Sequence, residues 1–390
     1  MTLKYSRYRL NITVIQTGEK MKFLFQCLFF LWAYSSCSYA TTIEVKLITD
    51  GLDRPWSLAF LPDGDFLVTE KKGSLRIVNP QGNISPAIQG LPVISVVGQG
   101  GLLDVAVHPD FEKNQWIYLS YVAGSAVKGY STEVVRAELQ GDRLHGHQLQ
   151  RVKKIFVAEP KTKGGRHFGS RLLMTNNRIT NNKTTKKAYL FISLGDRGVA
   201  AQAQDLTNHH GSLIRLYDDG SIPSDNPFVK VSDAKGEIFS YGHRNIQGLA
   251  VHPQTGELWA HEHGPQGGDE LNRIEIGKNY GWPVITYGVN YGLGTKIGEG
   301  THKQGMEQPR YFWDPSIAPS GLAFYQQRWL VGALKFQLLA ELTPANDSFS
   351  EQRYLHNQWG RVRDVRVKGK NIYLLTDSSK GKLLQLRMTP

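Results

Sequence analysis

Cysteine is nearly absent from this sequence of 390 residues, which has two, Cys27 and Cys37, both within the first forty positions. A chain that loses those positions on maturation has neither a disulfide framework nor thiolate chemistry. Lipid attachment at Cys37 is disfavoured, because Tyr34 stands where a lipobox has leucine. We therefore expect a mature protein without covalent cross-links.

Long apolar runs are also missing. The most apolar stretch, residues 23–34, has about twelve residues and is too short to span roughly 30 Å of hydrocarbon. Met21 and Lys22 precede this stretch, and the small residues Ser38 and Ala40 that follow it fit a signal-peptide cleavage site. We expect residues 1–40 to be an N-terminal extension and signal peptide with the true start at Met21. Cleavage near Ala40 would release a periplasmic or secreted protein with no stable membrane insertion.

The sequence has no dense basic run, no basic helix and no RNA-binding motif, although its formal net charge is +12. Nucleic acid is therefore not the expected partner. A βαβ unit with a G-x-G-x-x-G turn is missing too, so NAD is not expected to bind. The positive charge instead favours an anionic ligand, partner or surface.

The chain is rich in glycine and in short alternating strands. Its 40 glycines, 17 prolines and 11% aromatic residues suit many short strands joined by tight turns. Six similar units of strand, turn and strand recur about every sixty residues. They span residues 57–70, 101–121, 169–196, 248–262, 321–334 and 364–377. A β-sandwich has no reason to repeat one hairpin six times, so we predict an all-β fold, a six-bladed β-propeller with four-stranded blades that fills residues 41–390 as a single domain.

This fold predicts where functional side chains gather. In a propeller the first strand of each blade lines the central axis and the second returns to the same face, so residues before strand one and after strand two converge. At the strand starts these residues are Gln99, His167, Arg244, Asn245, Arg361 and Arg363. At the strand ends they are Asp196, Glu262, His263, Gly264, Pro265, Lys335 and Asp377. The four cations Arg244, Lys335, Arg361 and Arg363 would repel one another without a multiply anionic ligand between them. We expect a compact polycarboxylate or phosphate.

His167 is the one histidine at such a strand entrance. The glycines around it in GGRHFGS allow backbone and ligand to approach closely. Because imidazole titrates near neutral pH, His167 is the candidate general base. A structural histidine that hydrogen-bonds the turn is the alternative.

The densest polar run is HEHGPQGGDELNRIEIGKNYGWP at 261–283. Its His-x-His spacing could suggest zinc, but no third histidine or cysteine is placed nearby. Asp269, Glu270 and the backbone carbonyls of the glycine turns suit calcium better. A loop salt bridge is the alternative role for these two carboxylates.

Several segments together resemble the soluble PQQ-dependent aldose sugar dehydrogenases, relatives of soluble quinoprotein glucose dehydrogenase. The resemblance covers about residues 43–388, and its most specific segments are GQGGLLDVAVHPDF (98–111), SLGDRG (193–198), SYGHRNIQGLAVHP (240–253), HEHGPQGGDELN (261–272), WDPSIAPSGLAFY (313–325) and GRVRDV (360–365). It implies that pyrroloquinoline quinone (PQQ), a tricarboxylate, lies on top of the propeller. The implied cofactor contacts are Gln99, Arg244, Asn245, Lys335, Arg361 and Arg363.

The resemblance also implies two calcium ions. The carbonyl oxygens of Gly264 and Pro265 would bind the catalytic ion. Glu270 and Tyr280 would bind a separate structural ion.

A mechanism follows from the same resemblance. His167, oriented by Asp196, would take the proton of the C1 hydroxyl of an aldose sugar while the C1 hydride moves to PQQ. Arg244 and calcium would stabilise the developing oxyanion, and the product would be an aldonolactone. Reduced PQQ would pass its electrons to an external acceptor, a cytochrome or a quinone.

Residues 174–188, MTNNRITNNKTTKKA, depart from the family by replacing a short turn with a hydrophilic insertion. Two other functions stay open because a fold does not fix a function. One is a propeller that binds an anionic ligand or a protein without turnover. The other is a calcium-dependent lactonase, which would need carboxylate ligands on the axis.

Overall fold

The structure is a computed structural model that describes residues 41–142, 146–175 and 187–389. The chain has two compact units, one of Glu44–Arg387 and the other of Met1–Ile43 with Met388–Pro390. The expected signal peptide at 1–40 and residues 176–186 of the insertion lie outside the described residues. Within the described ranges, no helix is both long and apolar enough to cross a membrane.

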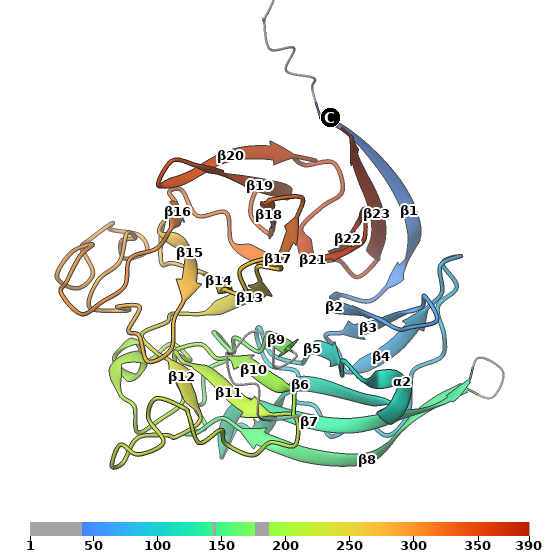
Figure 1. Cartoon of the computed structure of the whole chain (residues 1–390), viewed down its shortest axis with the longest axis horizontal. Helices are drawn as coiled ribbons and strands as arrows, with labels where there is room; N and C mark the ends of the chain where they lie inside the picture. The colour runs from blue at the N-terminus through green and yellow to red at the C-terminus, as the bar shows by residue number, and fades with distance from the viewer. Residues whose placement is uncertain (1–40, 143–145, 176–186, 390) are drawn as a thin grey trace, which may run out of the picture. The chain divides into compact units, whose positions relative to one another are not determined.

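The large unit is a six-bladed propeller, as predicted (Figure 1). Five of its antiparallel sheets have four strands and one has three. Blade one consists of β2 (Pro55–Phe60), β3 (Phe66–Glu70) and β4 (Ser74–Val78). Blade two consists of β5 (Leu102–Val107), β6 (Trp116–Ser125), β7 (Gly129–Asp142) and β8 (Gly146–Val157). Blade three consists of β9 (Leu172–Thr175), β10 (Tyr189–Ser193), β11 (Leu213–Tyr217) and β12 (Ile238–Ser240). Blade four consists of β13 (Ile246–Val251), β14 (Leu258–Glu262), β15 (Asp269–Ile274) and β16 (Tyr311–Trp313). Blade five consists of β17 (Pro319–Tyr325), β18 (Arg328–Ala333), β19 (Leu338–Ala345) and β20 (Ser348–Tyr354). Blade six consists of β21 (Val362–Lys368), β22 (Asn371–Thr376), β23 (Gly381–Thr389) and β1 (Thr42–Leu52). Two short helices, α2 (Phe111–Asn114) and η1 (Ala200–Gln204), complete the described elements.

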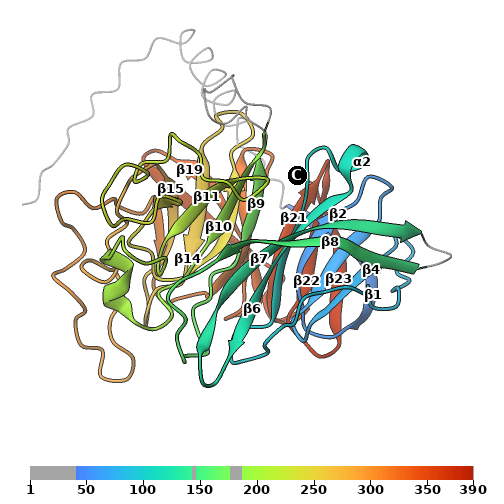
Figure 2. The ribbon, with the colours of Figure 1, turned by 90° about the horizontal axis from the view of Figure 1, so that it is seen from below.

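The ring of blades is closed by the first and the last strand of the described residues. Strand β1 pairs with β23, so an N-terminal strand completes the sheet of the last three strands (Figure 1). The long β7–β8 hairpin projects outward from blade two in both views (Figures 1 and 2). Closure of this kind joins the last blade to the first, because β1 leads into β2 along the chain.

Blade one is the exception to the four-stranded pattern. The segment at 83–88 runs along β4, with Ser85 N donating to Ile77 O at 2.8 Å and Ile88 N donating to Leu75 O at 2.9 Å. Pro86 lies between these two donors and has no N–H to add to the ladder. An irregular segment therefore takes the place of the predicted fourth strand.

Neighbouring blades pack face to face through apolar clusters. The cluster between blades four and five includes the side chains of Trp259 and Trp329, whose ring centroids are 5.3 Å apart. Every residue of β14 and of β10 is buried, because the central strands of a blade are covered on both faces. This packing gives the loops at the strand ends a rigid support.

The innermost strands of the blades surround the centre of the unit (Figure 1). There Arg171 Nη1 lies 3.3 Å from Asp104 Oδ1 and 3.2 Å from Asp364 Oδ1. Arg366 Nη2 lies 3.0 Å from Asp104 Oδ1, and its Nε lies 2.9 Å from Asp364 Oδ2. We call these four residues the axial ion cluster. Two arginines and two aspartates make it neutral, and it ties β5, β21 and the start of β9 together.

Candidate active site

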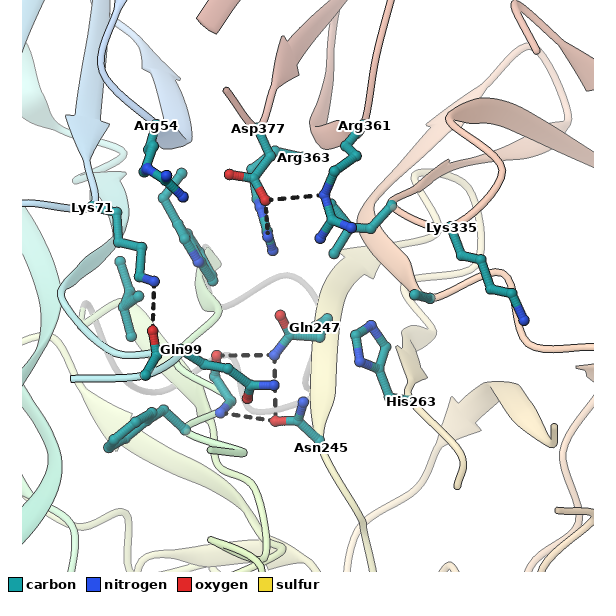
Figure 3. Close-up of a pocket in the computed structure, with 17 residues that line it drawn as sticks. Arg54, Lys71, Gln99, Asn245, Gln247, His263, Lys335, Arg361, Arg363 and Asp377 are labelled. Atoms are coloured by element: carbon teal, nitrogen blue, oxygen red, sulfur yellow. Dashed lines mark hydrogen bonds and ion pairs between the residues drawn. The ribbon is translucent and has the colours of Figure 1, made fainter. Parts of the chain in front are cut away.

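Two adjoining cavities lie where the inner strands begin and their partners end. The first has a volume of about 390 Å³ and takes its lining from all six blades (Figure 3). Its polar lining is Arg54, Lys71, Gln99, Asn245, Gln247, His263, Lys335, Arg361, Arg363 and Asp377. The second has a volume of about 450 Å³ and shares Gln99, His263, Ala318 and Lys335 with the first. His167, Arg244, Gly264 and Pro265 line this second cavity.

The first cavity carries an excess of positive charge. Five cationic side chains and one carboxylate line it, which leaves a net charge of +4. The carboxylate of Asp377 accepts from Arg363 at 2.9 Å and from Arg361 at 3.4 Å. Burial lowers the pKa of Lys71, Asp377 opposes that shift, and the charges of Arg363 and Arg54 add to it. The cations therefore destabilise one another, and an anionic ligand would relieve this repulsion.

Two of these cations, Arg54 and Lys71, were missed by the sequence analysis. Arg54 immediately precedes β2, and Lys71 immediately follows β3. They occupy in blade one the positions equivalent to the predicted site residues of the other blades. The first repeat unit had been started at Ser57, two residues inside the strand, so Arg54 was missed; Lys71 directly follows the end of that unit and was overlooked.

The backbone of His167 holds its side chain at the mouth of the second cavity. Its φ is 53°, in the left-handed region, and its N–H donates to Gln99 Oε1 at 2.7 Å. Ring atom Nδ1 lies 2.6 Å from Asp196 Oδ1. Within the described ranges Nε2 has no hydrogen-bond partner, and the side chain is 12% exposed. Nε2 is therefore the nitrogen that can accept a proton from a molecule in this cavity.

Asp196 lies behind His167 and is almost completely buried. Besides His167, it accepts from Gly198 N at 2.7 Å and from Trp282 Nε1 at 2.8 Å. Burial by itself raises the pKa of the carboxyl group, but the charge and hydrogen bond of His167, together with the other two donors, hold that pKa below its ordinary value. An ionised Asp196 keeps the proton of the neutral imidazole on Nδ1.

Arg244 and Asn245 are fixed at the start of β13. Arg244 N donates to Glu262 Oε2 at 2.5 Å, and its Nη1 donates to His263 O at 3.1 Å. The guanidinium carbon lies 5.2 Å from the centroid of a Trp282 ring. Asn245 Oδ1 accepts from Gly169 N at 3.1 Å, so the NH₂ group of Asn245 is left to face the cavity.

Part of the wall of the second cavity is rich in oxygen. Asp269 accepts from Gly264 N at 2.8 Å, from Ser316 Oγ at 3.0 Å and from Ala318 N at 2.8 Å. Burial raises the pKa of Asp269 to about 6 despite these donors. The carbonyl of Pro265 accepts from the Tyr291 hydroxyl at 3.0 Å and has a second lone pair. Gly264 and Pro265 thus offer oxygen atoms that suit a hard cation.

A third space, of about 10 Å³, lies between two acidic side chains. Glu262 on β14 and Glu270 on β15 are register partners, and both line it. Burial raises the pKa of Glu270 to about 8, and the charge of Glu262 adds to the rise. A single bound cation would offset both effects.

Tyr280 lines the same space, but its hydroxyl is engaged elsewhere. It donates to Arg273 O at 2.7 Å and accepts from Glu275 N at 2.9 Å. Tyr280 could therefore offer a cation its backbone oxygen. Over the described residues no group of three or more His, Cys, Asp or Glu side chains has metal-binding geometry, so backbone oxygens would have to complete any such site.

The chain is similar to known proteins over most of its length. The family model described as glucose/sorbosone dehydrogenase matches residues 52–385. Aldose sugar dehydrogenase YliI of Escherichia coli (strain K12) is 41% identical over 369 residues, which cover 91% of this chain and 94% of that protein.

Solved structures give the same result. The soluble aldose sugar dehydrogenase of Escherichia coli in its apo-form is 41% identical, with a TM-score of 0.82, over 88% of this chain and 99% of that one. The PQQ-bound aldose sugar dehydrogenase of Streptomyces coelicolor is 27% identical, with a TM-score of 0.75, over 90% of this chain and 99% of that one.

Proposed function

Because the chain belongs to the glucose/sorbosone dehydrogenase family, we propose that it is a PQQ-dependent aldose sugar dehydrogenase that oxidises C1 of the sugar to an aldonolactone. One observation carries this proposal: a cavity of about 390 Å³ with a net charge of +4 adjoins a second cavity that presents the His167–Asp196 pair. The similarity to a structure described as PQQ-bound supports the choice of cofactor.

The first cavity fits a tricarboxylate. Lys335, Arg361 and Arg363 would pair with the carboxylates of PQQ, and the amides of Gln99 and Asn245 would bind its polar edge. Bound PQQ supplies the quinone that accepts the C1 hydride, and the protein contributes binding and orientation. The net charge of +4 exceeds the three negative charges of the cofactor, so each carboxylate can find a cation.

The side chains of the second cavity handle the proton and the oxygen of the sugar. His167 Nε2 takes the proton of the C1 hydroxyl, and ionised Asp196 stabilises the resulting imidazolium through Nδ1. Arg244 lines the same cavity and would stabilise the sugar oxygen as negative charge develops on it. Loss of the hydroxyl proton and of the C1 hydride leaves the carbonyl of the lactone. An external acceptor would then take up the two electrons.

We place calcium at two sites in this proposal. The carbonyls of Gly264 and Pro265 would hold one ion beside the reacting oxygen, where a cation acts as a Lewis acid. Glu270, with Glu262 and the backbone oxygen of Tyr280, would hold the other. The lactonase alternative gains no support, because the axial aspartates are paired with arginines.

Reconstitution tests the proposal. Purified protein stripped of PQQ and calcium should be inactive, and adding both should produce aldose-dependent reduction of a dye, because the protein has no redox group of its own. PQQ alone, calcium alone and NAD serve as controls. Full activity after exhaustive removal of both components would contradict the proposal. PQQ binding without turnover of any aldose would favour the non-catalytic alternative.

Export is the second part of the proposal. Periplasmic protein is expected to begin at Thr41, because Ser38 and Ala40 satisfy the cleavage rule. N-terminal sequencing of periplasmic material measures this directly. Protein that keeps Met1 or Met21 there would be incompatible with cleavage.

A further inference from the structure

Trp282 contacts Asp196, which is the partner of the candidate base His167, and it also contacts Arg244. Its indole Nε1 donates to Asp196 Oδ2 at 2.8 Å, and Asp196 in turn contacts His167. One of its rings lies 5.2 Å from the guanidinium carbon of Arg244. The segment from β15 to β16 therefore brings one residue against both the partner of the candidate base and the candidate oxyanion-stabilising group.

The backbone of Trp282 is anchored independently of these two contacts. Trp282 N donates to Gly242 O at 2.9 Å, and Trp282 O accepts from Gln204 Nε2 at 2.8 Å. The residue is 9% exposed. Because blade three and the start of blade four both hold this backbone, the indole has little freedom to follow movements of Asp196 or Arg244. The indole therefore restrains the positions of Asp196 and Arg244.

We propose that Trp282 is a positioning residue that orients His167 through Asp196 and orients Arg244 through its ring face. The roles of His167 and Arg244 rest on the proposed function. The two contacts of Trp282 do not, and they can be tested in protein without cofactor.

The chemistry of the two contacts differs, so two substitutions separate them. Trp282→Phe keeps an aromatic ring beside Arg244 but removes the N–H donor to Asp196. Trp282→Leu removes the ring as well. With one donor fewer, the Asp196 carboxylate binds imidazolium more strongly, so the pH response of the His167 ring signals should differ from that of wild type. Asp196 interacts electrostatically with Arg197 and His210, and Arg244 lies in the same cavity as His167; all three groups are present in every variant.

The experiment begins with cofactor-free protein. The ring signals of His167, assigned by comparison with His167→Gln, are followed by NMR across pH in wild type and in Trp282→Phe. In the reconstituted enzyme, Trp282→Phe should lower kcat about tenfold with KM for the sugar within about twofold. Trp282→Leu should lower kcat/KM by a further factor of about five to thirty, because Arg244 loses its aromatic partner.

Trp313→Phe is the matched control. Trp313 is 2% exposed, and its Nε1 also donates to a carboxylate, Glu351 Oε1, at 3.0 Å, but this partner lies on the outer strand β20. The Trp313→Phe variant should leave the pH response of the His167 ring signals and kcat unchanged. The proposal is overturned if Trp282→Phe changes neither quantity more than Trp313→Phe does.

Two further outcomes are informative. If wild type has no PQQ-dependent turnover, the proposed function fails, and the His167 titration alone still decides whether Trp282 orients the pair. If Trp282→Phe does not fold, the test uses the NMR signal of the Trp282 indole N–H in proteins that keep this tryptophan. That signal should shift between wild type and His167→Gln, and an unchanged set of indole signals would overturn the proposal.

Discussion

His167→Gln is expected to lower turnover by roughly two to four orders of magnitude while PQQ still binds. Glutamine cannot accept the hydroxyl proton at neutral pH. Among the described residues, no hydrogen bond or ion pair joins the cationic side chains of the first cavity to the His167 ring, so the cofactor site should persist. Turnover is measured by dye reduction at saturating PQQ, and binding is measured by the absorbance change of added PQQ.

Arg361→Ala provides the contrast, because Arg361 lines the first cavity and has a different role. The Arg361 side chain is about half exposed, and Asp377 keeps its partner Arg363 when Arg361 is removed. Loss of one charged hydrogen bond, about 1.5 kcal/mol at this exposure, should weaken PQQ binding about tenfold. Excess cofactor should then restore turnover. Near-normal turnover of His167→Gln at saturating PQQ would mean that the proton acceptor lies elsewhere.

The fold was predictable because each blade repeats one pattern. Alternating apolar strands separated by turn residues identify the hairpins, and six repeats identify the propeller. The three-stranded blade was not predictable from spacing, since the outcome depends on how Pro86 meets the edge of β4. The β1–β23 closure was likewise outside the pattern, because it joins segments more than three hundred residues apart.

The candidate site was predictable from one rule, which selects the residues just before the first strand and just after the second strand of each blade. The rule placed Gln99, Asn245, Lys335, Arg361 and Arg363 around one cavity, and that is where the structure places them. Residues outside the rule were missed. Trp282 comes from a loop between outer strands, and only the tertiary structure brings its indole to Asp196.

The axial ion cluster left a signal in the sequence that was not used. Asp104 interrupts the apolar strand LLDVAV, and Asp364 lies between Arg363 and Arg366 in the strand segment VRDVRV. A charge in the middle of a buried strand requires a buried partner. The partner Arg171 lies in a different blade, however, so the sequence alone could indicate the need for a partner but not its identity.

Asp104→Asn is expected to lower the free energy of unfolding by about 3–5 kcal/mol. Asp104 is completely buried and accepts from Arg171, Arg366, Ser57 and the backbone of Leu172. The neutral amide would leave two arginines against the single carboxylate of Asp364, a net buried charge of +1. Urea denaturation of the cofactor-free protein measures the change, with unfolding followed by tryptophan fluorescence.

Two further variants test whether the unbalanced charge causes the loss of stability in Asp104→Asn. Glu159→Gln removes one carboxylate from an exposed pair with Lys235, at 2.9 Å, and should cost less than about 1 kcal/mol. Adding Arg366→Met to Asp104→Asn restores neutrality in the cluster, so the double variant should be more stable than the sum of the two single changes predicts. If the two changes are simply additive, the cost of Asp104→Asn comes from lost hydrogen bonds and packing. If Asp104→Asn costs no more than Glu159→Gln, the axial ion cluster does not stabilise the propeller.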